Sequence, residues 1–203
     1  MCPLRLIVGL GNPGPQFERT RHNVGAWWVR DLADRLGINL VSNAKFKGDI
    51  GRGIIAGQDV RLLLPGTFMN HSGDSVGAVM RFYKLAVEEV LVAYDEMAFE
   101  PGSVRLKQGG GDNGHHGLKS VRNGCGNMED FHRLRIGVGH PGDKSRVTAY
   151  LTQVKMPQKE EELIGGALAI PDAVLTNIIK GDWQAAMNVL HAGGDPAVEN
   201  KED

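Results

Sequence analysis

Several polar side chains that could activate water follow directly after apolar segments of the sequence. Asn12 and His22 come after the apolar run 4–10, and Asp95 comes directly after the run 90–94. An imidazole titrates near neutral pH and can take a proton from water. A carboxylate bound to one ring nitrogen fixes the tautomer and leaves the other nitrogen as a base. His22 is therefore the candidate catalytic base, and Asp95 is the candidate acid that orients it.

Two asparagines and two aromatic residues stand in the same loops. The amides of Asn12 and Asn70 could hold a substrate carbonyl or stabilise an oxyanion, although Asn in a loop more often forms an Asx-turn. Phe17 and Phe68 could stack on bases or cover a ligand, although a loop aromatic more often anchors the loop to the core. Taken singly, each residue is better explained by its structural role, and only the combination indicates a site.

The elements that must position these residues alternate between strands and helices. Apolar runs predict strands at 4–10, 38–41, 50–56, 60–64, 90–94, 104–107 and 134–138, with a hairpin turn at 57–59; periodicity predicts helices at 24–36, 76–83, 117–122 and over most of 157–191. This alternation predicts an α/β fold with a twisted mixed, largely parallel sheet and helices on both faces. Sites in such folds form at the carboxyl ends of strands. Asn12, His22, Asn70 and Asp95 are therefore expected around one cleft.

Composition indicates one globular domain. The chain has 203 residues, of which 41% are hydrophobic and 23% are charged, which excludes wholesale disorder, collagen and coiled coil. No apolar run approaches the ~20 residues that span a bilayer, and the first residues lack the features of a signal peptide. Cys2 and Cys125 are the only cysteines, so we expect no disulfide framework and a cytoplasmic location. The predicted domain covers residues 1–193, and residues 194–203 are expected to form a frayed acidic tail.

Charge is unevenly distributed along the chain. Residues 101–155 carry nine Lys and Arg against four Asp and Glu, whereas residues 156–203 carry three against nine. A basic stretch in an otherwise neutral protein is compatible with a polyanionic partner such as nucleic acid. A solvated face balanced by the acidic segment is the simpler explanation.

Four other classes of site have to be considered. Residues 9–14 match G-x-G-x-x-G, the pattern of a dinucleotide-binding loop, directly after a strand. However, Pro13 and Pro15 stiffen the turn, and the predicted helix begins only about ten residues later. The second strand region is also not followed by the acid that would bind a ribose hydroxyl. The glycines 109–111 precede a predicted helix and could cradle a phosphate or form a mobile surface loop. The four histidines His115, His116, His132 and His140 lack the spacing of a catalytic zinc site, and no G-x-S-x-G elbow of a serine hydrolase occurs.

The motifs together resemble the bacterial peptidyl-tRNA hydrolase family. The resemblance runs from Leu6 to about His191. It is densest in residues 8–14 (VGLGNPG), 20–25 (TRHNVG), 67–73 (TFMNHSG), Lys107 with 109–111 (GGG), 131–137 (FHRLRIG) and 140–142 (HPG). Several separate motifs in the right order are far more specific than any one of them.

The resemblance implies a monomeric single-domain enzyme that hydrolyses the ester between a stalled peptide and the tRNA 3′ ribose, with no metal or organic cofactor. By resemblance, His22 is the base, Asp95 orients it, and Asn12 helps to distinguish N-blocked peptidyl esters from free aminoacyl-tRNA. Asn70 matches an amide that contacts the 3′ end and helps to position water. Phe17 and Phe68 match the aromatic rings of the two loops, and Lys107 and Arg135 match basic residues associated with the tRNA phosphate. Peptidyl-tRNA is the implied partner, and no membrane is implied.

One departure from the family pattern concerns residue 116. The family usually has Gly-His-Asn-Gly where this chain has Gly-His-His-Gly at 114–117, so His116 replaces an amide that touches substrate. We expect His116 to keep the binding role with an altered pH dependence, because imidazole can become cationic. Asn113 also stands where glycine is common. The alternative from another class is an RNA-binding relative that has lost hydrolysis, but retention of His22 and Asp95 favours the enzyme.

Overall fold

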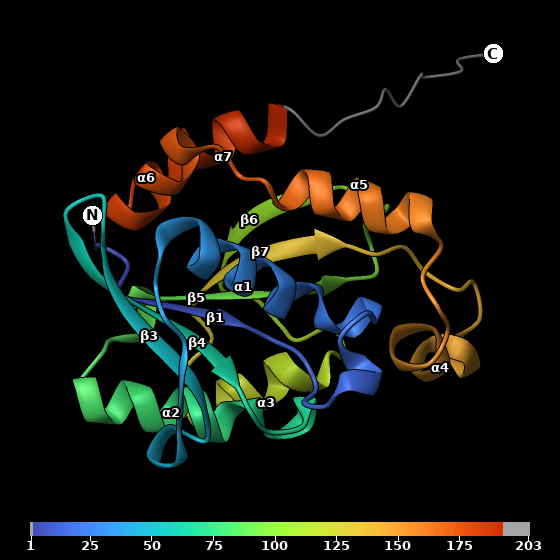
Figure 1. The fold of residues 1–203 in the computed structure, drawn as a ribbon, viewed down its shortest axis with the longest axis horizontal. Helices are drawn as coiled ribbons and strands as arrows, with labels where there is room; N and C mark the ends of the chain where they lie inside the picture. The colour runs from blue at the N-terminus through green and yellow to red at the C-terminus, as the bar shows by residue number, and fades with distance from the viewer. Residues whose placement is uncertain (1, 193–203) are drawn as a thin grey trace.

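One seven-stranded sheet organises the part of the chain that the computed structural model describes, residues 2–192 (Figure 1). The strand order is β2-β3-β4-β1-β5-β7-β6. The strands are β1 (Leu6–Gly9), β2 (Val41–Asn43), β3 (Gly48–Ile55), β4 (Gln58–Pro65), β5 (Val90–Glu96), β6 (Val104–Gln108) and β7 (His132–Gly137). The helices are α1 (Val24–Leu36), α2 (Ser72–Tyr83), α3 (His116–Gly124), α4 (Val147–Thr152), α5 (Gln158–Leu168), α6 (Asp172–Lys180) and α7 (Trp183–Ala192).

The centre of the sheet is parallel and its edges are antiparallel. β4, β1, β5 and β7 run in the same direction, whereas β2 and β3 on one side and β6 on the other pair antiparallel to their neighbours. The predicted α/β fold with a mixed, largely parallel sheet is confirmed. Because the four parallel strands end at the same edge, the loops that follow them meet there.

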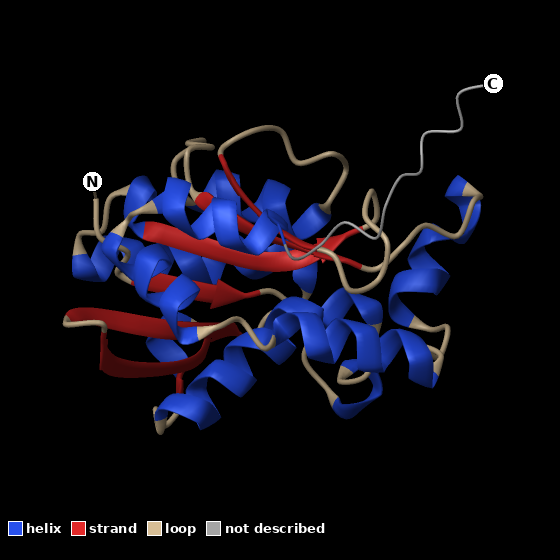
Figure 2. Cartoon of the chain, turned by 90° about the horizontal axis from the view of Figure 1, so that it is seen from above, coloured by secondary structure: helices blue, strands red, loops and turns tan. Residues whose placement is uncertain are grey.

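Helices cover both faces of the sheet, which explains the continuous apolar runs of the central strands. In β1 every residue is buried: Ile7 belongs to one hydrophobic core, while Leu6 and Val8 belong to the other. The first core lies under α1 and the helices α5 to α7, and the second under α2 and α3 (Figure 1). Figure 2 shows the strands side by side with helices packed along them.

The start of α1 lies unusually close to the sheet. A Cβ on Gly25 would stand 2.2 Å from the carbonyl oxygen of Ala93, and a Cβ on Gly9 would stand 2.5 Å from the carbonyl oxygen of Gly25. Only glycine at both positions permits this approach of helix to strands. The close approach holds the short 3₁₀ turn Arg21–Asn23, which immediately precedes α1, against the end of β5. Gly9 of the G-x-G-x-x-G match thus serves helix packing here.

Most predicted elements agree with the structure, and four details differ. The helix predicted at 24–36 is confirmed within its bounds, ending at Gly37 in the left-handed conformation. The strand expected at 38–41 is wrong in position, because β2 begins only at Val41. The hairpin turn lies at 56–57 rather than 57–59, and α4 falls in a region where no helix was predicted. The apolar periodicity of the predicted helix 24–36 also places Leu36 on its buried side, but Leu36 is 37% exposed. The predicted boundary between residues 193 and 194 lies outside the described residues.

No single helix in residues 2–192 is long and apolar enough to cross a membrane. α5 and α6 satisfy the length and composition only when taken together, and they are bent by 60° at the break between them. Their apolar side chains, including Ile164, Leu168 and Ile178, are buried in the core.

Candidate active site

A pocket opens where the parallel strands end. Its volume is about 340 Å³, and its walls come from the loops after β1, β4 and β5, from the segment that leads into α3, and from α4. The residues that line it are Asn12, His22, Phe68, Met69, Asn70, Tyr94, Asp95, Glu96, Met97, Asp112, Asn113, Gly114, His115, His116, Val147, Thr148, Leu151 and Thr152. The structure thus brings Asn12, His22, Asn70 and Asp95 around one cleft, as the topology predicted.

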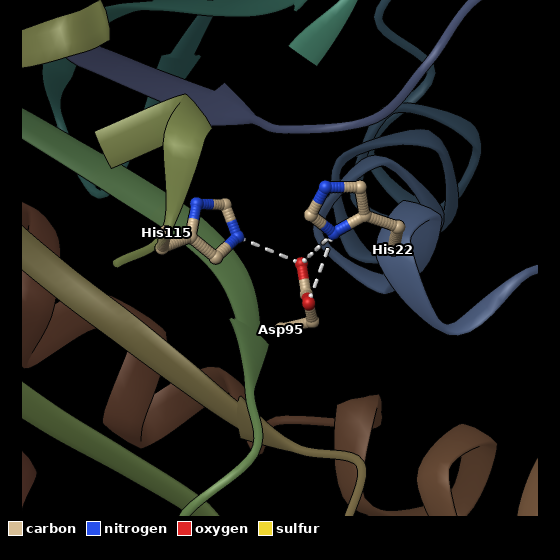
Figure 3. A group of neighbouring side chains, drawn as sticks. All are labelled: His22, Asp95 and His115. Carbon is tan, nitrogen blue, oxygen red and sulfur yellow. Dashed lines mark hydrogen bonds and ion pairs between the residues drawn. The ribbon is translucent and has the colours of Figure 1, made fainter. Parts of the chain in front are cut away.

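His22 and Asp95 form a hydrogen-bonded pair in this pocket (Figure 3). The Nδ1 atom of His22 lies 2.9 Å from Oδ1 and 3.0 Å from Oδ2 of Asp95. Because the carboxylate can only accept, Nδ1 carries the proton and donates it to Asp95. The Nε2 atom of His22 is then unprotonated and free to take a proton from a ligand in the pocket.

Burial and charge act in opposite directions on this pair. Burial of the His22 ring disfavours its charged form, but the negative charge and hydrogen bond of Asp95 outweigh burial, so the pKa of His22 is raised. Asp95 is 2% exposed. Burial alone would raise the pKa of Asp95, but His22 and His115 hold it well below its usual range. Asp95 is therefore an anion at neutral pH.

His115 is a second imidazole on the same carboxylate. Its Nε2 atom lies 2.9 Å from Oδ1 of Asp95, and its Nδ1 atom accepts a hydrogen bond of 3.2 Å from the backbone N–H of Leu118. The accepting role of Nδ1 places the proton of a neutral ring on Nε2, which donates to Asp95. The ring also packs edge-on against Tyr94, with centroids 5.1 Å apart. His115 is thus held in one tautomer and holds Asp95 from the side opposite His22 (Figure 3).

The orientation of the Asn12 amide is fixed by its neighbours. Its Oδ1 atom accepts from the backbone N–H of Met69 at 2.8 Å. Its backbone N–H donates to Oδ1 of Asn23 and its carbonyl accepts from Nδ2 of Asn23, at 2.8 and 2.9 Å. Because Oδ1 of Asn12 already accepts a hydrogen bond from Met69, the Nδ2 group is available to bind a ligand. An amide NH₂ group can only donate hydrogen bonds. Asn12 is therefore suited to a carbonyl or oxyanion of the substrate.

Asn70 and His116 connect the pocket to a neighbouring groove. Both side chains are exposed, and both line the pocket and also a second depression of about 520 Å³ between α2 and α3. Lys119 and His71 line that groove together with Asp74. The polar side of the pocket thus continues onto a polar surface that contains Lys119 and Asp74.

The two aromatic residues of the loops meet at the rim of the pocket. Phe17 and Phe68 contact each other edge to face, with ring centroids 6.4 Å apart. Phe68 lines the pocket and is 57% exposed, whereas Phe17 is half-buried and is not among the lining residues. The contact joins the loop after β1 to the loop after β4.

The basic residues matched by resemblance lie on β6 and β7, outside the pocket lining. Lys107 is exposed, and its Nζ atom lies over Gly110. Arg135 is largely buried: its Nε atom donates to Oε2 of Glu96 at 3.1 Å, and its guanidinium lies 4.4 Å from the centroid of the Phe99 ring. Lys107 is therefore the more accessible of the two cations.

The glycine-rich loop does not form the N-terminus of a helix, since α3 begins five residues after Gly111. The buried Arg133 side chain donates to the carbonyl oxygens of Gly110 and Gly111, the latter at 2.7 Å. Arg133 thereby ties the loop to β7, so the loop's backbone is held rather than left as an open phosphate cradle. This finding disfavours the phosphate-cradle interpretation of residues 109–111.

The two histidines around Asp95 lie close enough to it for the three side chains to hold a metal ion. His22, Asp95 and His115 each offer one ligand atom, and these atoms lie within 4.8 Å of one another. In the arrangement observed, however, Nδ1 of His22 and Nε2 of His115 both carry the protons that they donate to Asp95. A metal ion would have to displace both protons. The donors therefore fit a hydrogen-bonded triad better than a metal centre.

Four of the residues that shape the site were not predicted as site residues from the sequence: His115, Asn23, Arg21 and Arg133. His115 and Asn23 lie inside motifs that were quoted, directly beside His116 and His22. Their position next to a predicted site residue is the signal in the sequence that could have identified them. Which of two neighbouring side chains turns inward depends on the first turn of the helix, and hydrophobic periodicity does not report it.

An α/β fold with an imidazole–carboxylate pair at the carboxyl edge of its sheet is the architecture of an enzyme that moves protons. Comparison with known proteins agrees. The family model described as Peptidyl-tRNA hydrolase matches residues 6–200. The peptidyl-tRNA hydrolases of Pseudomonas aeruginosa and Tolumonas auensis are 45% and 48% identical to this chain. These two matches cover 95% and 94% of this chain, and 98% and 96% of the relatives.

A solved structure is similarly close. The crystal structure of peptidyl-tRNA hydrolase from Acinetobacter baumannii is 47% identical, with a TM-score of 0.90, over 96% of this chain and 97% of that chain. The chain belongs to the peptidyl-tRNA hydrolase family.

Proposed function

We propose that this chain hydrolyses the ester bond between a peptide and the 3′ ribose of tRNA, with His22 as the general base. Family membership supports the reaction and the substrate class. The observation that carries the assignment of the base is the His22–Asp95 pair, which leaves Nε2 of His22 as the acceptor in the pocket. Freeing tRNA from stalled peptides is the consequence of this reaction.

In the proposed reaction, Nε2 of His22 takes a proton from a water molecule as the water oxygen attacks the ester carbon. The carbonyl π bond opens and its electron pair moves to the oxygen. When the carbonyl reforms, the bond from carbon to the ribose 3′ oxygen breaks, and the protonated His22 gives its proton to that oxygen. The products are a peptide carboxylic acid and a free tRNA hydroxyl. One residue thus serves first as base and then as acid.

Asp95 and His115 act as positioning residues in this mechanism. Asp95 fixes the tautomer of His22 and stabilises the imidazolium that forms during the reaction. His115 donates to Oδ1 of Asp95 and keeps that carboxylate in place. The buried carboxylate therefore has a donor on each side, which satisfies it without solvent.

The amides of Asn12 and Asn70 complete the proposed site. Nδ2 of Asn12 donates to a carbonyl of the substrate, where it supports a blocked peptidyl ester over a free aminoacyl ester, and a donor aimed at developing oxyanion charge accelerates acyl transfer. Asn70 and His116 hold the 3′ end at the junction with the α2–α3 groove, and Asn70 helps to place the water. Phe17 and Phe68 cover the ligand at the rim, while Lys107 and Arg135 contact tRNA phosphate.

The test is release of peptide from N-acetylaminoacyl-tRNA, with unblocked aminoacyl-tRNA as the control substrate. The wild-type chain is expected to hydrolyse only the blocked substrate, and His22→Ala is expected to lower kcat by roughly 10²- to 10⁴-fold. His140→Gln is the matched histidine control, because His140 is exposed and does not line the pocket.

The outcome also separates the enzyme from the RNA-binding alternative. Binding of tRNA without hydrolysis would support a relative that has lost its activity, and His116 would be the first residue to revert to asparagine. Hydrolysis that survives His22→Ala would show that another group is the base.

We also propose that the chain acts as a monomer in the cytoplasm. The proposed base, the two positioning residues and both amides line one pocket of one chain, so the hydrolysis step needs no second copy. The two cysteines are unpaired, and Cys125 is buried, which suits a reducing compartment. Light scattering on the purified chain tests the mass in solution.

A further inference from the structure

Arg21, the residue directly before His22, is a buried cation that the mechanism above does not use. Its side chain is 2% exposed, and it lies in the 3₁₀ turn Arg21–Asn23 that carries His22. A buried guanidinium is costly unless its donors are satisfied. The groups that accept hydrogen bonds from Arg21 therefore show which parts of the chain this side chain holds together.

All of these contacts reach toward α4 and α5. Nε and Nη2 of Arg21 donate to Oε2 of Glu160, in the first turn of α5, at 3.2 and 2.7 Å. Nη1 donates to the backbone carbonyls of Tyr150, within α4, and Val154, just beyond it, at 3.3 and 3.2 Å. One planar fork thus binds the end of α4 and the start of α5 together.

Stacking adds a further constraint on α4. The guanidinium carbon of Arg21 lies 4.0 Å from the centroid of the Tyr150 ring, and the Tyr150 hydroxyl donates to the carbonyl oxygen of Val138 at 2.6 Å. The ring is therefore fixed between Arg21 and the segment after β7. Rotation of α4 about its axis would break both contacts.

The opposite side of α4 forms a wall of the pocket. Val147, Thr148, Leu151 and Thr152 line the pocket that also contains His22. This wall is apolar with two hydroxyl groups, whereas the wall at Asn70 and His116 is polar and continues into the groove that contains Lys119. A polyanionic tRNA end fits the polar side. The α4 wall is then the side for the acyl part of the substrate.

We propose that Arg21 is a positioning residue that sets the distance between the α4 wall and His22, and so determines how the peptide part of the substrate is held. The inference rests on the proposed function. It predicts a role for Arg21 in substrate fit rather than in proton transfer. A change at Arg21 should shift α4 while leaving the His22–Asp95 pair intact.

Arg21→Lys tests the proposal, because lysine keeps the charge but cannot form the planar fork. Two substrates are compared: N-acetylalanyl-tRNA, with one residue, and N-acetyltrialanyl-tRNA, with three. We expect KM for the longer substrate to rise about tenfold relative to the shorter one, since small displacements of positioning groups have large kinetic effects. We expect kcat for the shorter substrate and the pH profile of kcat/KM to stay unchanged, which loss of overall stability would not produce.

Arg19→Lys is the matched control. Arg19 pairs with Glu161, the neighbour of Glu160 in α5, but its side chain is 80% exposed and a surface ion pair contributes little. This variant should leave the KM ratio of the two substrates unchanged. Hydrogen exchange should increase over residues 147–156 in Arg21→Lys and not in Arg19→Lys.

If Arg21→Lys does not fold, Glu160→Gln tests the proposed role of Arg21 instead. It keeps Arg21 and its carbonyl contacts and removes only the charge of the partner, so a smaller rise in the same KM ratio is expected. An unchanged KM ratio in the folded variants, or a shift in the pH profile, would overturn the proposal. If the wild-type chain hydrolysed neither substrate, the proposed function would fail; if it hydrolysed both and the ratio did not move, only the role of Arg21 would fail.

Discussion

At the scale of single residues, the charge on Asp95 raises the pKa of His22, the proposed base. The base must be neutral, so kcat/KM is expected to fall as the pH drops through the pKa of His22, which burial lowers but Asp95 raises more strongly. Asp95→Asn removes the charge that raises the pKa of His22 and leaves the burial that lowers it. The acid limb of the profile, where kcat/KM falls as the pH drops, should therefore move to lower pH. The same change should lower kcat by roughly 10²- to 10⁴-fold, because the imidazolium loses its counter-charge. A pH series of kcat/KM measures both effects.

His115→Asn should shift the acid limb of the kcat/KM profile in the direction opposite to Asp95→Asn. Loss of the Nε2–H donor leaves Asp95 with more charge to share with His22, so the acid limb should move to higher pH. If both variants moved the limb in the same direction, the two imidazoles would not be acting through Asp95 as described.

His116 supplies a second residue-scale prediction. The imidazole of His116 is exposed, it is bulkier than the amide that the family has at this position, and unlike an amide it can become cationic. The titratable and charged groups around it are His71, Asp74 and Lys119 in the groove and Asp112 in the pocket. The hypothesis of an altered pH dependence predicts that KM of the wild-type chain varies with pH, because a cation at this junction would favour the polyanionic substrate. His116→Asn should flatten this dependence, and an unchanged pH profile of kcat/KM would refute the role.

At the scale of elements, docking of α7 involves two histidines, the buried His132 and the half-buried His191. The His132 ring, at the start of β7, stacks on Trp183 with centroids 3.5 Å apart, and Nε2 of His191 accepts from the backbone N–H of Leu106 on β6. Burial lowers the pKa of His132 to about 4, although a hydrogen bond to the Glu88 backbone opposes the shift. Burial also lowers the pKa of His191. Both rings must therefore stay neutral for α7 to remain in place.

Acid should accordingly weaken the fold. Unfolded His132 takes up a proton near pH 6.5 and folded His132 only near 4, so stability is lost as the pH falls through this interval, by up to about 3 kcal/mol. His22, whose pKa is raised, acts in the opposite sense. Urea unfolding at pH 7.5 and pH 5, followed by Trp fluorescence, measures the loss. His132→Phe keeps a ring against Trp183 without titrating, so its pH dependence should be smaller; an equal dependence in both chains would show that another group is responsible.

The elements also show what sequence reasoning can and cannot supply. The strand before Asn12 and the helix after His22 were predictable because their apolar periodicity is long, and the parallel topology then placed Asp95 nearby. β2 was misplaced because it is a three-residue edge strand whose position is set by pairing with β3. α4 was missed because six residues hold too little periodicity, and its sequence VTAYLT has several β-branched residues of low helix propensity. Contacts from Arg21, distant in sequence, hold it in place.

The same limit applies within the site. His115 and His116 are adjacent in sequence, yet His115 is the N-cap of α3 and points at Asp95, while His116 is the first helical residue and is exposed. The sequence identified the motif but not which imidazole turns inward. That choice follows from the Leu118 N–H, which binds Nδ1 of His115 and so draws its ring over the helix end.

At the scale of the whole molecule, we propose that the basic segment 101–155 binds the phosphates of tRNA. Exposed Lys107 lies on β6 at one edge of the sheet, and binding of phosphates releases counterions, so log KM should rise linearly with log salt concentration. Lys107→Ala should reduce this slope by about 1 with little change in kcat, because the lysine lies outside the pocket lining. Lys45→Ala is the control, since Lys45 follows β2 at the opposite edge of the sheet and should leave the slope unchanged. Equal slopes for the wild-type chain and both variants would mean that the β6 edge does not face the phosphates, and the tRNA would then have to approach over the α2–α3 groove alone.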